Sequence, residues 1–149
     1  MAAGAAGCDP PRLYTPTEGG YMGATITPKT TWIVRGNLST PSAAADENLA
    51  SIARSDYDYA GAHLTIDLGQ PCMFQTVIID HGREDRGHCR TVGVATSLDG
   101  RLWIGRHTGP GTRRVTILSL PQVVLARYVR IQAAQPGVQP WAVAELYLQ

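Results

Sequence analysis

The sequence predicts an all-β protein, an antiparallel jelly-roll β-sandwich of about eight strands that follows an extended N-terminal arm. From Thr31 onward, apolar runs of about five to seven residues alternate with clusters of Gly, Pro, Asp and Ser. Several runs alternate apolar and polar residues, as half-buried strands do. No segment after the arm sustains a helical stripe for three turns, so a parallel sheet with crossover helices is a poor fit.

We expect strands at eight places, each bounded by turn residues: 31–35, 63–68, 76–80, 91–97, 101–106, 113–118, 127–133 and 142–148. The apolar members of the alternating runs should face the core, and they are Leu64, Ile66, Leu68, Val115, Ile117, Val129 and Ile131. Residues 42–54 are rich in alanine but interrupted by charged and polar residues, which predicts one short turn of helix.

The chain divides into an arm at 1–30 and a single sandwich domain at 31–149. Gly, Ala, Pro and Thr dominate the arm, which cannot pack a core of its own. A hydrophobic content of 44% over 149 residues is enough for one domain core. Cys8, Cys72 and Cys89 lack any metal-site spacing, and with an odd number at least one is free or paired outside the chain. We interpret them as buried or incidental thiols.

The charge balance excludes some partners. Thirteen Lys and Arg residues against 12 Asp and Glu residues leave a net charge of +1, too little for a nucleic-acid binder that neutralises many phosphates. No stretch approaches the roughly 20 apolar residues of a membrane span. Lys29 is the only lysine, so nearly every cation is a guanidinium, which suits planar recognition of carboxylates or polar ligands.

Four blocks of sequence share the order of a known family. Residues 41–51 (PSAAADENLAS) run into an acidic loop, and residues 64–69 (LTIDLG) end a strand in Asp-Leu-Gly. Residues 97–103 (SLDGRLW) join an Asp-Gly turn to a tryptophan, and 126–131 (ARYVRI) are followed by 141–147 (WAVAELY). Together these blocks resemble the discoidin or coagulation-factor type C domain, which is also the fold of family 32 carbohydrate-binding modules. In that setting we interpret Trp103 as a plug in the core or at a corner.

Glu145 shares a strand face with Val143 and Tyr147, so its carboxylate should be partly buried and should require a cation. The resemblance implies that this cation is a structural calcium ion, which prefers six to eight oxygen ligands. Carried over by position, the metal ligands would be Asp46, Asn48, Ser51 and Glu145, with help from the carbonyl oxygen of Ala43.

Two departures from the family pattern count against calcium. Glu47 stands where the family prefers glycine, at a cost of about 1 kcal/mol if the backbone there needs a positive φ. The tryptophan expected shortly after Ser51 is absent. The alternative is an ordinary surface turn in which Asp46 caps a short helix and Arg54 replaces the ion as the partner of an acid.

Two polar loops are candidates for a ligand surface at one end of the sandwich. Residues 56–61 carry two aromatic rings that can stack on a sugar, and nearly every side chain of residues 81–90 can form hydrogen bonds. The candidate carbohydrate-binding residues are Tyr57, Tyr59, His81, Arg83, Arg86 and His88. The alternative is a solvated loop whose charges cancel in local pairs, each worth at most about 1 kcal/mol.

We find no nucleophile motif and no phosphate-binding loop, so we do not expect an enzyme. The prediction is a non-catalytic module that binds a glycan or polysaccharide, most naturally at an extracellular, cell or virion surface. The alternative is a structural assembly subunit, such as a virion decoration or tail component or a filament protein. In that case the partners would be neighbouring protein subunits, and the arm would clamp them, giving a homo-oligomer.

Overall fold

The computed structural model describes residues 16–17, 20–21, 26, 29–56 and 61–149. Within these residues the helical segments are two short 3-10 turns, Lys29–Thr31 and Pro41–Ala45. The second lies at the start of the segment for which one helical turn was predicted. This described part of the chain includes no helix long and apolar enough to cross a membrane.

The strands form an antiparallel β-sandwich, as predicted. They are β1 (Pro16–Thr17), β2 (Gly20–Tyr21), β3 (Ile33–Gly36), β4 (Ala53–Arg54), β5 (His63–Asp80), β6 (Thr91–Ser97), β7 (Ile104–Pro110), β8 (Val115–Gln135), β9 (Ala142–Val143) and β10 (Glu145–Leu148). The main sheet has the order β10-β5-β8-β6-β7, and β3 also pairs with β5. Two small pairs, β1 with β2 and β4 with β9, complete the topology.

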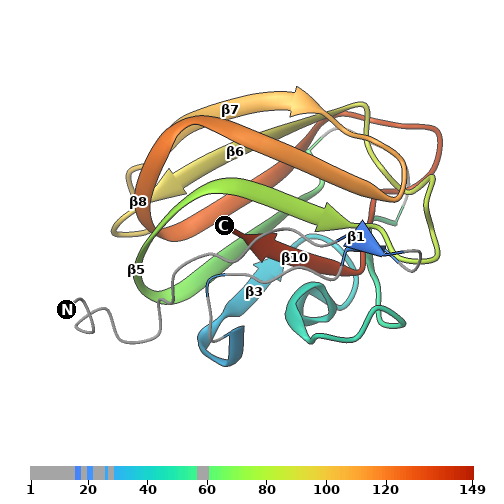
Figure 1. Ribbon diagram of the computed structural model, residues 1–149, viewed down its shortest axis with the longest axis horizontal. Coiled ribbons are helices and arrows are strands. Elements are labelled where there is room, and N and C mark those ends of the chain that lie inside the picture. The colour runs from blue at the N-terminus through green and yellow to red at the C-terminus, as the bar shows by residue number, and fades with distance from the viewer. Residues whose placement is uncertain (1–15, 18–19, 22–25, 27–28, 57–60) are drawn as a thin grey trace.

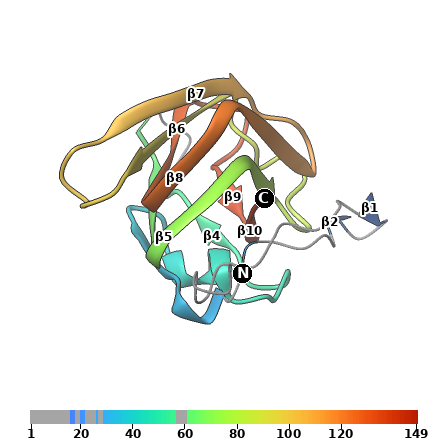
Figure 2. The same cartoon turned by 60° about the vertical axis from the view of Figure 1, so that its left-hand side comes forward.

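The strands β5 and β8 are much longer than predicted, because each merges two predicted strands. Irregular register between Asp67 and Cys72 and between Phe74 and Thr76 lets the pair β5–β8 continue past Pro71. Both strands curve strongly, as Figures 1 and 2 show. The first half of β5 pairs with β3, and its second half pairs with β10. The curved pair therefore wraps around the core.

The core is built from the alternating residues of these strands. Leu64, Ile66 and Leu68 of β5 are buried, as are Val129 and Ile131 of β8. At the start of β8 the alternation is right but the predicted faces are reversed. Thr116 and Leu118 point inward, and Ile117 is 46% exposed. The inversion has a polar cause, because the Thr116 hydroxyl contacts a buried histidine, His81.

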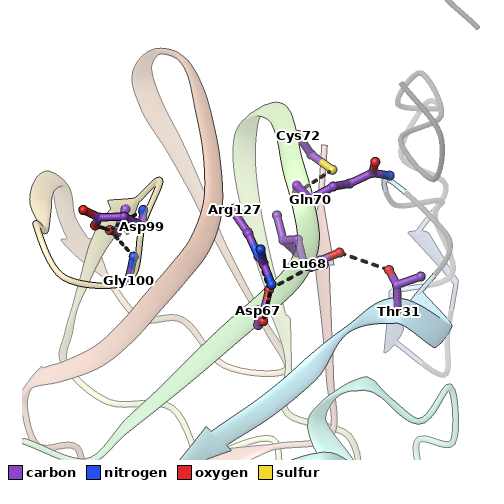
Figure 3. Close-up of polar contacts among 10 residues, drawn as sticks. Thr31, Asp67, Leu68, Gln70, Cys72, Asp99, Gly100 and Arg127 are labelled. Carbon is purple, nitrogen blue, oxygen red and sulfur yellow. Dashed lines mark hydrogen bonds and ion pairs between the residues drawn. The ribbon is translucent and has the colours of Figure 1, made fainter. Parts of the chain in front are cut away.

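Hydrogen bonds explain the two Asp-containing turns of the sequence blocks, and Figure 3 shows Asp67 with Arg127 in the first turn and Asp99 beside Gly100 in the second. Asp67 Oδ1 accepts from the N–H of Gly69, whose φ is +87°, and both carboxylate oxygens of Asp67 accept from Arg127. Asp99 Oδ1 accepts from the N–H groups of Arg101 and Leu102, and Gly100 takes a φ of +79°. Only glycine adopts such values without strain.

The folded unit begins before residue 31. Ile26 is buried, and its N–H donates to the carbonyl oxygen of Leu148 at 2.7 Å. Lys29, which was assigned to the arm, is only 5% exposed. Elsewhere in the predicted arm, Pro16–Thr17 and Gly20–Tyr21 form the pair β1–β2, whereas residues 1–15, 18–19, 22–25 and 27–28 lie outside the described residues. Cys72 is disulfide-bonded, which the interpretation as incidental thiols did not anticipate, whereas Cys89 is buried and its Sγ donates to the carbonyl oxygen of Thr91 at 3.4 Å.

Candidate functional site

A hollow of about 530 Å³ lies where three segments meet at one end of the sandwich. The pairing of β4 with β9 places Arg54 beside Ala142, and the loop after β5 supplies residues 83–86. The turn before β9 supplies the third wall. We call this hollow the arginine cleft, and its lining residues are Arg54, Arg83, Glu84, Asp85, Arg86, Gln139 and Pro140.

Ion pairs within and beside the arginine cleft neutralise its two acids. Arg54 pairs with Glu84, and their hydrogen bond holds the pKa of that carboxyl below its usual value. Arg113 pairs with Asp85 at 2.8 Å from outside the lining, and this contact likewise lowers the pKa of Asp85. The alternative of locally cancelled charges therefore holds for these pairs. It does not extend to Arg83 and Arg86.

Arg83 and Arg86 are the cations of the cleft that keep hydrogen-bond donors for a ligand. Both are exposed. Arg83 donates from Nη1 to the carbonyl oxygen of Ala50 at 3.2 Å, which fixes the side chain and leaves its other donors. Of the residues described, none forms a hydrogen bond or ion pair with the Arg86 guanidinium. A second hollow of about 620 Å³ shares Arg83 and Asp85, so Arg83 stands between two concave surfaces.

His81 cannot contact a ligand, so the prediction for this residue is wrong. Its side chain is fully buried, Nδ1 lies 2.7 Å from the carbonyl oxygen of Ala142, and Nε2 lies 2.8 Å from Thr116 Oγ1. Burial lowers the pKa of His81 to about 4. A neutral ring that donates from Nδ1 and accepts at Nε2 satisfies both contacts. His81 therefore fixes the base of the loop that carries Arg83 and Arg86.

His88 is the remaining predicted ligand residue that the structure describes. His88 is partly buried, and its Nδ1 is buried without a hydrogen-bond partner in the described structure. Its ring centroid lies 6.1 Å from that of His81, so the two histidines share one interior region. Tyr57 and Tyr59 lie outside the described residues. Their loop starts within three residues of Arg54 in the cleft wall. Their role in stacking on a sugar stays a prediction.

Contrary to our interpretation of the sequence, Trp103 does not plug the core. The residue is partly exposed, and the Arg130 guanidinium carbon lies 4.2 Å from the centroid of the Trp103 ring. Arg130 alternates with the buried Val129 and Ile131, so this stack lies on the outer face of the sheet. Arg130 also donates from Nε to Thr65 Oγ1 at 3.2 Å. Trp103 thus braces the sheet from outside.

The residues implied as calcium ligands are arranged differently from a metal site. Glu145 is 1% exposed, and its Oε2 accepts a hydrogen bond from Lys29 Nζ. Its Oε1 accepts from the N–H of Glu47 at 2.9 Å. Burial raises the pKa of Glu145 to about 7 and lowers that of Lys29, while the contact between them opposes both shifts.

Two side-chain oxygens in the loop of the implied site accept hydrogen bonds from the loop backbone. Asp46 Oδ1 accepts from the N–H of Asn48, and Asn48 Oδ1 accepts from the N–H of Ala50, both at 3.0 Å. The carbonyl oxygen of Asn48 accepts from the N–H of Ser51 at 3.1 Å. Across the described ranges, no three acidic, histidine or cysteine side chains are placed to hold a metal ion. The residues present do not fit calcium.

Residues 25–146 match the F5/8 type C domain, and the chain belongs to this family. The match starts at residue 25, which agrees with the burial of Ile26 and Lys29. No curated protein sequence matches the chain.

Solved structures of carbohydrate-binding modules have the same fold. The family 32 module of NanJ from Clostridium perfringens, in complex with galactose, is 17% identical, with a TM-score of 0.72 over 83% of this chain and 97% of that one. A Clostridium perfringens module in complex with GalNAc-β-1,3-galactose is 15% identical, with a TM-score of 0.71 over 81% and 96%. The module of AlyQ in complex with 4,5-unsaturated mannuronic acid is 18% identical, with a TM-score of 0.66 over 78% and 93%.

Proposed function

We propose that this domain is a non-catalytic carbohydrate-binding module whose saccharide occupies the arginine cleft. The observation that carries the proposal is the cleft itself, a concave surface at one end of the sandwich with Arg83 and Arg86 exposed on one wall. Support comes from the family and from the fold shared with modules solved with galactose and GalNAc-β-1,3-galactose.

The chemistry of the cleft suits a polar sugar. Saccharide hydroxyls need a few convergent donors and acceptors beside an apolar face. Arg83 and Arg86 supply donors, and Gln139 supplies an amide that donates and accepts. Pro140 contributes apolar surface, and the predicted stacking rings of Tyr57 and Tyr59 would complete the face. His81 acts indirectly by anchoring the loop.

A glycan array with the full chain, followed by calorimetric titration of the best saccharide, tests the proposal. Replacing one arginine removes charge-assisted hydrogen bonds, so Arg86→Ala and Arg83→Ala should each weaken affinity at least about tenfold. Arg101→Ala is the matched control, because Arg101 is an exposed arginine in the Asp99 turn and does not line the cleft. The proposal fails if no saccharide binds, or if the cleft variants bind as tightly as Arg101→Ala.

The alternative function, a structural assembly subunit, draws on the arm. Most of the arm at 1–30 lies outside the described residues, and the contacts of its described residues are with the chain's own sandwich or within the arm. Its test is the oligomeric state of the full chain by light scattering. A monomer that binds saccharide supports the module, whereas a stable multimer without saccharide affinity supports the assembly subunit.

A further inference from the structure

The most deeply buried ion pair among the described residues joins Lys29 to Glu145. The lysine comes from the 3-10 turn before β3, and the glutamate is the first residue of β10. Their side chains are 3% and 1% exposed. A buried carboxylate requires a compensating cation, and Lys29 supplies it. Lys29 is also the only lysine of the chain, so it can be addressed without ambiguity.

Aromatic rings complete the surroundings of the Lys29 ammonium. Nζ lies 4.0 Å from the centroid of the Tyr147 ring and 5.6 Å from that of Trp32. Both distances are within the range of cation–π attraction, which strengthens when water is excluded. The second oxygen of Glu145 is held by the N–H of Glu47. Both carboxylate oxygens are thus engaged by donors of the chain.

The backbone around Lys29 is fixed on both sides. Ile26 donates its N–H to the carbonyl oxygen of Leu148, and Thr31 Oγ1 donates to the carbonyl oxygen of Leu68 at 3.0 Å. The carbonyl oxygen of Lys29 itself accepts from the N–H of Trp32 at 2.9 Å. The segment that carries Lys29 is therefore attached to both β5 and β10, and this attachment holds the ammonium beside Glu145. Its presence there does not depend on the concentration of any ion in solution.

We propose that the Lys29 ammonium takes the place of the calcium ion that the family resemblance implies, so that the domain reaches its full stability without any divalent cation. The positive charge at Glu145 is supplied by the chain itself. It joins the N-terminal segment to the last strand, and it places a positive charge at Oε2 of Glu145, where it would repel a metal ion.

The first test measures thermal unfolding of the full chain in EDTA and in millimolar calcium. A ligand that binds only the folded state raises the midpoint, so the proposal expects a difference below about 1 °C. Terbium is a second probe, because Trp32 and Tyr147 beside the site would sensitise its luminescence. No sensitised signal is expected. A calcium-dependent rise in the midpoint that disappears in Glu145→Gln would overturn the proposal.

The second test is a double-mutant cycle. Lys29→Met keeps the length of the side chain but strands the Glu145 charge, and the midpoint should fall by about 10 °C. The double variant Lys29→Met with Glu145→Gln removes both charges and should recover part of that loss. Strictly additive losses would contradict the proposal, because they would mean that Lys29 acts by packing alone.

A labelling experiment needs no variant and therefore does not depend on folding of a mutant. An amine-reactive acetylating reagent modifies exposed lysine, and mass spectrometry of the peptide that holds Lys29 reports the modification. In the native chain Lys29 should be acetylated at least about a hundredfold more slowly than in urea, because reaction requires opening of the buried pair. Equal rates in the two conditions would place the ammonium outside the site and would refute the proposal.

Discussion

The N–H of Glu47 donates to Oε1 of Glu145 at 2.9 Å while Glu47 itself holds a φ of +60°. This left-handed conformation is costly for a residue with a Cβ atom. Glu47 is exposed, so packing of its side chain does not explain the conformation. The turn keeps a strained residue at the point where its N–H meets the buried carboxylate.

Glu47→Gly should therefore stabilise the domain. Loss of the Glu47 carboxylate by itself changes the charge near Lys29. Glu47→Ala is therefore the matched control, because it removes the carboxylate but keeps the Cβ atom. We expect Glu47→Gly to exceed Glu47→Ala by about 1 kcal/mol in the free energy of unfolding, measured with urea. If the alanine variant were at least as stable as the glycine variant, the backbone at residue 47 would not be strained.

Burial of His81 makes stability depend on pH. The folded-state pKa of His81 is about 4, below its usual value of 6.5, so the unfolded chain binds this proton first as the pH falls. The stability that the neutral, buried His81 ring contributes is fully present above pH 6.5 and is lost as the pH falls to about 4. One such group corresponds to about 3 kcal/mol over that range.

Comparing the unchanged chain with His81→Gln isolates the contribution of His81, because the carboxylates titrate in both proteins. At pH 7 the variant should be the less stable, since it loses hydrogen bonds to Thr116 and Ala142. The difference in unfolding free energy should shrink by about 3 kcal/mol between pH 6.5 and 4. A gap that stays constant across this range would show that His81 does not titrate as its burial requires.

Gly100 and Gly105 offer a paired test of the hairpin turn. Gly100 has a φ of +79°, and a Cβ atom there would lie 3.4 Å from the Tyr128 ring. A Cβ atom on Gly105, in contrast, would meet nothing within 4 Å. Gly100→Ala should cost about 1 to 2 kcal/mol in urea unfolding, whereas Gly105→Ala should be neutral or slightly stabilising. Equal losses in both would argue against a turn-specific strain.

Local patterns in the sequence identified most of the fold. The alternation at 64–68 and the Asp99-Gly100 turn each depend on neighbours along the chain, and both are present as predicted. The merging of strands was not predictable in this way. Gly69 and Pro71 are typical breaks, yet the long-range pairing of β5 with β8 carries the strand past them through irregular register.

The candidate site was predicted in part. The loop with Arg83 and Arg86 does line the cleft, because polar loops at the sandwich end are forced outward. His81 was missed as a buried group because its burial depends on Thr116, a residue from another strand. Glu145 was expected to need a cation, but Lys29 lies 116 residues away in a Pro- and Thr-rich segment. The one signal in the sequence for this partner was that Lys29 is the only lysine.

Chemical-shift mapping tests the central claim most directly. The saccharide that binds best would be titrated into the labelled chain while the backbone amide resonances are recorded. We expect perturbations confined to residues around Arg54, to residues 82–87 and to residues 139–141, which surround the arginine cleft. Perturbations centred on the outer sheet face around Arg130, or no perturbation at all, would contradict the assignment of the cleft as the saccharide site.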